Sequence, residues 1–251
     1  MEELVDAVAS ETSLTVEVNG TEVARLLCSP SDEEALAAGF LFTEGLLSER
    51  TTLLSLEDDK AEGALRVSIA GLADNWTDLL SRKTYASGCG RGVTFSGTVE
   101  QAWKEVDRGM LRWSIPQITD RLRELRERSG LYIQTGGVHS AALSDGEKLI
   151  LFAEDIGRHN AVDKVIGRAF LNGVSLADKI LVSSGRISSE IMGKVIRAGI
   201  PMLVSRAAPT CRSVSAAEDA GVTLIGFARG DRMNIYSHPW RVQLPGWGTS
   251  S

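Results

Sequence analysis

The second half of the chain alternates short apolar runs with segments of helical periodicity, and this alternation restricts the fold more than any other feature. From Leu131 onward the apolar runs are LYIQTGG, KLILFAED, KILVSSGR, PMLVSRAAPT and VTLIGFARG. Between them, the segment from Asn160 to Leu171 places its apolar residues on one helical face and meets Gly173 as a stop. Strands alternating with helices of this length predict an α/β fold with much parallel pairing.

The N-terminal part has a different pattern. Two alternating apolar runs between Leu14 and Leu27 flank the turn dipeptide Asn19-Gly20, which predicts a hairpin. A helix is expected to begin at Ser31-Asp32-Glu33-Glu34, run through ALAAGFLFTEGLL and stop near Gly45. The run LRVSIAG predicts a strand, and the stretch rich in Gly and Ser from Arg82 to Thr98 predicts a loop.

One further helix is predicted before the α/β region. It extends from Ile118 to Arg128, with Thr119 or Asp120 as its cap and with Arg and Glu alternating on its outer face.

Length and charge limit the classes of protein that remain. A chain of 251 residues with 43% hydrophobic content can bury one full-sized core and a smaller satellite. The net charge of -6 and the pI near 5.2 argue against general electrostatic binding to nucleic acid or to an anionic membrane. An anionic ligand would therefore need a local cluster of cations.

The opening residues, the apolar runs and the cysteines together predict a protein of a reducing compartment. The opening MEELVDAVASE lacks the basic and apolar regions of a secretory signal, and no apolar run approaches the roughly 18 to 20 residues of a membrane span. Cys28, Cys89 and Cys211 are widely separated, without the spacing of a disulfide framework. We expect a cytoplasmic protein with reduced thiols.

Arginines follow the predicted strands. Four apolar runs are each followed by at least one, namely Arg158, Arg186, Arg206, and the pair Arg229 and Arg232. In an open α/β sheet the ligand crevice lies at the carboxyl ends of the strands, and guanidinium groups bind phosphate bidentately. The pattern predicts a phosphate-binding site, although the arginines could instead form surface ion pairs with Glu154, Asp155 and Asp231.

The segment Ser87-Gly88-Cys89-Gly90-Arg91-Gly92 predicts a reactive thiol. Glycines on both sides favour an exposed, mobile Cys89, and Arg91 can stabilise its thiolate. The alternative is a small buried residue in a tight turn.

The other two cysteines differ in their surroundings. Cys28 in RLLCSP is expected in the core. Cys211 follows Pro209-Thr210 at a predicted helix start, which is compatible with a reactive thiol or with a small packed residue.

His139 and His159 both occupy predicted junctions between a loop and a helix, where contact with a ligand or a structural hydrogen bond would fit. Zinc is not expected, because the chain has no Cys-x-x-Cys pair, no two histidines spaced i and i+4, and His238 stands apart.

These segments resemble the formate dehydrogenase accessory sulfurtransferase (FdhD) family. The matching blocks run in order across roughly residues 34 to 240. They are GFLFTEGLL, SGCGRG, TGGVHSAAL, EDIGRHNAVDKVIG, SSGRISSEIMGK, SRAAPT and GFARGDRMNIYSHP.

The resemblance implies a cytidine-deaminase-like three-layer α/β core, a homodimer, and sulfur transfer from a cysteine desulfurase. It implies that Cys89 carries a persulfide whose sulfur passes to the molybdenum bis-molybdopterin guanine dinucleotide cofactor before insertion into the formate dehydrogenase catalytic subunit. Guanine nucleotides would be partial mimics of that cofactor. The expected cofactor-binding residues are His139, Arg158, His159, Asn160, Arg186, Phe227, Ala228, Arg229, Gly230, Asp231 and Arg232.

The resemblance also divides the chain. Residues 1–80 would form an N-terminal subdomain, 81–100 a flexible sulfur-carrier loop, 101–240 the cofactor-binding core and 241–251 a tail.

Two departures from known patterns bear on the alternative functions. Many members carry Cys-Gly-x-Cys in the sulfur loop, whereas Gly92 replaces the second cysteine here. A chaperone that shelters the cofactor without carrying sulfur is therefore an alternative. A nucleotide-processing hydrolase ranks last, because His139 is followed by Ser140 and Ala141 rather than by the His-x-Glu of zinc deaminases.

Overall fold

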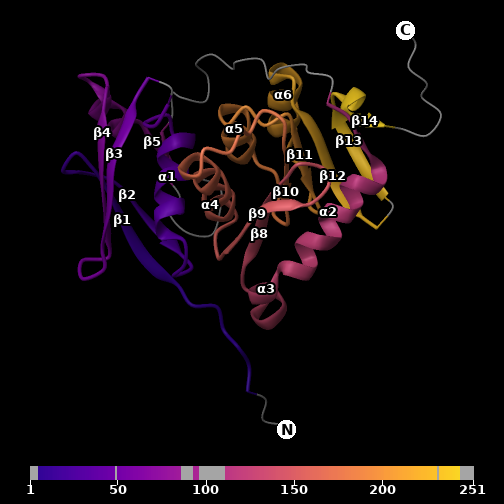
Figure 1. The fold of residues 1–251 in the computed structure, drawn as a ribbon, viewed down its shortest axis with the longest axis horizontal. Helices are drawn as coiled ribbons and strands as arrows, with labels where there is room; N and C mark the ends of the chain where they lie inside the picture. Colours follow the sequence, from indigo (N-terminus) through magenta and orange to yellow (C-terminus); the bar gives the residue numbers. More distant parts are fainter. Residues whose placement is uncertain (1–4, 49, 86–92, 96–110, 231, 244–251) are drawn as a thin grey trace. The chain divides into compact units, whose positions relative to one another are not determined.

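The computed structural model shows a mixed α/β protein and describes residues 5–48, 50–85, 93–95, 111–230 and 232–243 (Figure 1). The chain forms two compact units. Unit 1 comprises residues 1–101, 129–141 and 153–174, and unit 2 comprises residues 102–128, 142–152 and 175–251. Within the described ranges, no helix has the length and apolarity needed to span a bilayer.

Unit 1 contains a four-stranded sheet in the order β2-β1-β4-β3. Its strands are β1 (Thr12–Val18), β2 (Thr21–Cys28), β3 (Thr52–Asp59) and β4 (Ala64–Ala70). The β1–β2 hairpin turns at Asn19 and Gly20, both with positive φ, as the dipeptide predicted. Helix α1 (Glu33–Thr43) buries Leu36 and Phe40 in one hydrophobic cluster with these strands. The predicted hairpin, helix and LRVSIAG strand are confirmed.

Helix α4 (Arg158–Leu171) packs against α1 (Figure 1). Two glycines lie at the contact. A Cβ atom added to Gly39 would lie 1.9 Å from the carbonyl oxygen of Asp163, and one added to Gly167 would lie 1.9 Å from that of Ala35. Only glycine permits such an approach of two helix backbones. The Thr43 hydroxyl donates to the buried Asp163 carboxylate at 2.8 Å across the same contact.

A six-stranded sheet has the order β13-β12-β11-β10-β8-β9. Its strands are β8 (His139–Ser144), β9 (Leu149–Asp155), β10 (Ile180–Ser183), β11 (Met202–Ser205), β12 (Thr223–Arg229) and β13 (Arg232–Ser237). Strands β10, β11 and β12 are parallel, as predicted, and β13 is antiparallel to β12. The connecting helices are α5 (Ser189–Arg197) and α6 (Cys211–Ala220).

Helix α2 (Ile115–Arg128) contributes Ile118, Leu122 and Leu125 to a hydrophobic cluster with strand residues such as Val182 and Val204. The remaining elements are short. They are η1 (Trp76–Arg82), β5 (Lys83–Tyr85), β6 (Val93–Phe95), β7 (Trp113–Ser114), α3 (Gly130–Thr135), η2 (Pro239–Arg241) and β14 (Val242–Gln243).

The run LYIQTGG was predicted as a strand, which is wrong. It forms α3, because the Glu154 carboxylate accepts hydrogen bonds from the backbone N–H groups of Leu131 and Tyr132, at 3.0 and 2.9 Å. Gly136 then ends the helix with φ 64°. His139 consequently begins strand β8 instead of lying at a junction between a loop and a helix.

One helix boundary and one predicted loop also differ from the predictions. Helix α2 starts at Ile115 rather than Ile118, because Pro116 is tolerated in a first turn and Ser114 exchanges two hydrogen bonds with Gln117. The stretch predicted as a loop contains the paired strands β5 and β6.

The expected contiguous domains do not coincide with the two units, because the α1–α4 contact joins residues 153–174 to the N-terminal sheet.

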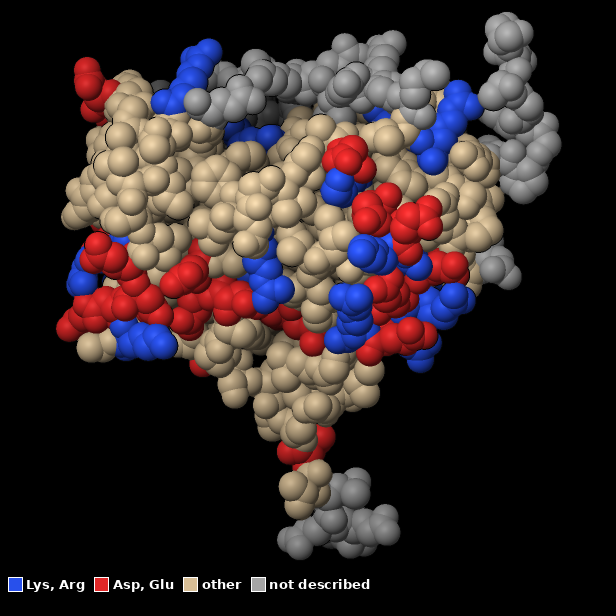
Figure 2. All heavy atoms as spheres, viewed as in Figure 1, with Lys and Arg blue, Asp and Glu red and all other residues tan. Residues whose placement is uncertain are grey.

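The two units also differ in net charge. Unit 1 has 21 acidic and 10 basic residues, and unit 2 has 12 acidic and 17 basic residues. Their formal net charges are therefore -11 and +5. In Figure 2, a band of red acidic side chains crosses the lower part of the N-terminal strands, whereas red and blue side chains are mixed over α2.

Candidate functional site

In unit 2, the segments that follow β10 and β11 are joined at the carboxyl ends of the strands. Ile187 N–H donates to the Ala208 carbonyl and Thr210 N–H donates to the Ile187 carbonyl, both at 3.0 Å. The Ser205 hydroxyl donates to the Gly185 carbonyl at 2.7 Å. These bonds make one continuous surface from two loops that carry Arg186 and Arg206.

The helices that leave this edge are capped by their own residues. Thr210 and Ser213 form a capping box at the start of α6. At the start of α5, Ser188 accepts from Ile191 N–H and also contacts the Glu190 carboxylate at 2.9 Å. A carboxylate in the first turn disfavours a second anion there. The arginine side chains at this edge therefore favour an anion more than the helix N-termini do.

The end of β12 contains an irregularity that exposes an aromatic ring. The pairing of β12 with β13 shifts between Gly226 and Arg229, and Phe227 within this bulge has φ 51° and is 42% exposed. Its N–H donates to the Ala207 carbonyl at 3.1 Å. A left-handed backbone is uncommon for a bulky residue, and such strain is concentrated at functional sites.

Arg229 and Arg232 lie next to this bulge, at the end of the β12–β13 hairpin. Arg229 Nε donates to the Arg206 carbonyl at 3.3 Å, which fixes one guanidinium over the end of β11. Arg229 and Arg232 are Cα partners across the hairpin, an arrangement of like charges that is unfavourable unless an anion offsets it. The edge of unit 2 thus combines an exposed ring with arginines from neighbouring strand ends.

Not every predicted residue of this segment presents its side chain. Ala228 is buried in the hydrophobic cluster of unit 2. Arg186, Arg229, Gly230 and Arg232 are exposed. Asp231 lies outside the described residues.

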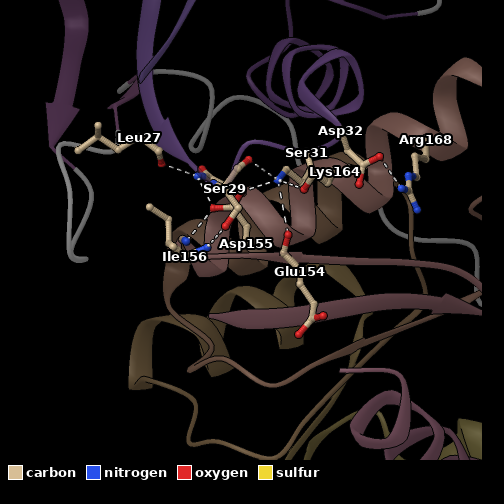
Figure 3. Close-up of polar contacts among 11 residues, drawn as sticks. Leu27, Ser29, Ser31, Asp32, Glu154, Asp155, Ile156, Lys164 and Arg168 are labelled. Carbon is tan, nitrogen blue, oxygen red and sulfur yellow. Dashed lines mark hydrogen bonds and ion pairs between the residues drawn. The ribbon is translucent and has the colours of Figure 1, made fainter. Parts of the chain in front are cut away.

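In unit 1, Arg158 and His159 are the first two residues of α4 and are half-buried, which confirms the predicted position of His159 at a helix start. His139 is half-buried at the start of β8. The neighbouring acids have structural partners. The Asp155 carboxylate pairs with Lys164 at 2.6 Å (Figure 3). The Glu154 carboxylate accepts hydrogen bonds from the backbone of α3.

The described cysteines match their predicted locations. Cys28 is fully buried, and burial, reinforced by the charge of Asp155, raises its thiol pKa to about 12. Cys211 is exposed as the first residue of α6. Cys89 and the rest of SGCGRG lie outside the described residues. Among the residues that the structure describes, no group of three or more His, Cys, Asp or Glu could hold a metal ion.

Comparison with known proteins identifies the family. The family model described as FdhD/NarQ matches residues 9–243. The chain belongs to the FdhD/NarQ family. Curated FdhD/NarQ relatives include "Sulfur carrier protein FdhD" of Wolinella succinogenes, 40% identical, with the alignment covering 95% of this chain and 83% of the relative. The protein of the same name from Staphylococcus haemolyticus is 36% identical, covering 95% of this chain and 90% of the relative.

A solved structure also resembles this FdhD/NarQ chain. It is a crystal structure described as a formate dehydrogenase accessory protein from Desulfotalea psychrophila, with a TM-score of 0.78 and 27% sequence identity. The match covers 96% of this chain and 93% of that one. The resemblance found from the sequence blocks is therefore confirmed at the level of the family.

Proposed function

We propose that this FdhD/NarQ protein is a sulfur carrier that supplies sulfur to the molybdenum bis-molybdopterin guanine dinucleotide cofactor for formate dehydrogenase. The observation that carries the proposal is the glycine-flanked Cys89 in a chain whose relatives are named sulfur carrier proteins. In the first step, the Cys89 thiolate attacks the terminal sulfur of a desulfurase persulfide. The S–S bond of that persulfide breaks, a new one forms on Cys89, and the desulfurase cysteine leaves as a thiolate.

The cofactor is the cargo, and its phosphates account for the arginine cluster. We assign Arg229 and Arg232 in unit 2 to phosphate contact and Phe227 to contact with a guanine or pterin ring, with Arg206 and Arg186 beside them. The basic charge of unit 2 supports this assignment. In unit 1, His139, Arg158 and His159 are proposed as further cofactor contacts.

The wider setting is part of the same proposal. The partners would be a cysteine desulfurase, the catalytic subunit of formate dehydrogenase and a second copy of this chain, in the cytoplasm. A relation of the core to the cytidine deaminases is also proposed from the family resemblance.

The direct test is mass mapping after incubation with a cysteine desulfurase and cysteine. Cys89 should gain about one sulfur atom, ~32 Da. Cys89→Ala should lose that gain and still bind GDP. Arg229→Ala should keep the gain and bind GDP more weakly by about 1.5–3 kcal/mol, the free energy of one charge-assisted hydrogen bond.

A chaperone that shelters the cofactor without sulfur transfer is the second candidate, because Gly92 replaces the second cysteine common in the family. The two functions predict different results in cells that lack the native protein. A sulfur carrier requires that Cys89→Ala abolish formate dehydrogenase activation. Full activation by Cys89→Ala would favour the chaperone.

A further inference from the structure

The Asp155 carboxylate is the centre of a buried network in unit 1 (Figure 3). Its Oδ2 accepts from Lys164 Nζ at 2.6 Å and from Ser29 N–H at 3.0 Å. Its Oδ1 accepts from Gly157 N–H and from Asn160 Nδ2, both at 2.8 Å. Four hydrogen bonds satisfy a carboxylate that has no exposure to water.

Lys164 and Ser29 extend the network to the end of β2. The Lys164 ammonium, itself fully buried, also contacts the Ser29 carbonyl at 3.2 Å. The Ser29 hydroxyl in turn accepts from Ile156 N–H at 3.1 Å. Breaking a buried ion pair leaves a desolvated charge, so this arrangement resists rearrangement.

Asn160 was predicted to contact the cofactor, but its amide nitrogen is already occupied. Nδ2 donates to the Leu27 carbonyl and to Asp155 Oδ1, both at 2.8 Å, which uses its two N–H groups. The side chain folds back over Gly157, where an added Cβ would lie 2.8 Å from Asn160 Nδ2. The glycine is therefore needed to admit this conformation.

We infer that Asn160 is a positioning residue that, with Asp155, fixes the backbone of residues 156–160 and so presents Arg158 and His159. Ile156 and Gly157 are held before these two residues, by Ser29 and Asp155, and Asn160 is held directly after them. A segment fixed on both sides loses little conformational freedom when a ligand binds. The use of this positioning in nucleotide recognition rests on the proposed function.

The test compares Asn160→Ala with Asn172→Ala in the full-length protein. Asn172 caps the other end of α4, where its amide donates to the Arg168 carbonyl at 2.7 Å. Asn160→Ala should shift the NMR resonances of the His159 ring and raise the Kd for GDP about 10-fold, as expected for loss of buried hydrogen bonds. Asn172→Ala should change neither.

Gly157→Ala provides a second variant that displaces the Asn160 amide without removing it, and it should reproduce both effects. If the His159 resonances do not shift in Asn160→Ala and Gly157→Ala, the inference is overturned, whether or not GDP binding is retained. A loss of GDP binding without such a shift would mean that Asn160 contacts the ligand directly. Shifted resonances with unchanged GDP affinity would overturn the link between this positioning and nucleotide binding. Failure of the wild-type protein to bind GDP would instead refute the proposed site, with the resonances still testing the positioning.

Discussion

At the scale of single residues, burial determines which cysteine thiols can react. Cys28 is fully buried in the core of unit 1 with a pKa near 12, whereas Cys211 is exposed at the start of α6. Only a thiolate with access to solvent reacts rapidly, so reactivity follows location rather than residue type.

Cys211 should react with iodoacetamide at least about 100-fold faster than Cys28 in the native protein at pH 8, because Cys211 is exposed whereas burial shields Cys28 and raises the pKa of its thiol. Peptide mapping over a time course measures the two rates. In denaturant, where neither is buried, the rates should become similar. Equal rates in the native protein would contradict the buried location of Cys28.

Phe227 offers a prediction in which stability and function separate. Phe227→Gly removes a side chain from a left-handed backbone, φ 51°, so the free energy of unfolding should stay unchanged or rise by up to about 1 kcal/mol. The same variant should bind GDP more weakly, because the exposed ring is lost. Denaturant titration and calorimetry measure the two quantities, and a large loss of stability would contradict the strain.

At the scale of helices and strands, the α1–α4 contact requires glycine on both sides. Gly39→Ala should lower the free energy of unfolding by more than about 3 kcal/mol, since its Cβ would lie 1.9 Å from a backbone oxygen. Gly193→Ala in α5 is the control, because nothing lies within 4 Å of its added Cβ. It should raise stability by about 0.5–1 kcal/mol. Equal effects would refute the close helix crossing.

The buried ion pair gives another prediction at this scale. Lys164→Met should destabilise the protein by about 3–5 kcal/mol, because Asp155 would remain buried without its cation. Arg25→Met breaks the surface pair with Glu22, whose side chains are 63% and 51% exposed, and should cost less than about 1 kcal/mol. Thermal or chemical denaturation of both variants measures the two losses of stability. A small loss in Lys164→Met would show that the pair is dispensable.

The sequence predicted the elements whose apolar periodicity is strong, such as the β1–β2 hairpin, α4 and the parallel strands. It missed β8, because His139–Ser144 is built largely from alanine and serine, which have weak strand preference. It misassigned α3, because the helix depends on a carboxylate distant in sequence, Glu154. Local patterns contain no information about such tertiary contacts.

The candidate site divides in the same way. The placement of arginines after strands predicted the edge of unit 2, because topology alone brings parallel strand ends together. The roles of Ser29 and Lys164 were not predicted, since a lysine within a helix is usually solvated. Asn160 was assigned to the cofactor from a motif, and only the structure shows that its amide donates to Leu27 and Asp155.

At the scale of the whole molecule, the two units have opposite net charges, -11 and +5, so electrostatics favour an anion near unit 2 over unit 1. The Kd for GDP should therefore rise roughly 3- to 10-fold between about 50 and 500 mM KCl, as salt screens the arginines. Arg229→Ala should reduce this dependence. A Kd that does not change with salt, measured by calorimetry, would argue against arginine–phosphate contacts.

Unit 1 is built from three separate segments of the chain, and this has a consequence for its folding during synthesis. Helix α1 ends at Thr43, but its partner α4 ends only at Leu171. At about 5–20 residues per second, a ribosome needs roughly 10 s to make the intervening chain. During that interval the surface of α1 around Gly39 has no partner, so the nascent chain is most exposed to misassembly before residue 171 emerges. Slow translation of that stretch would prolong the risk.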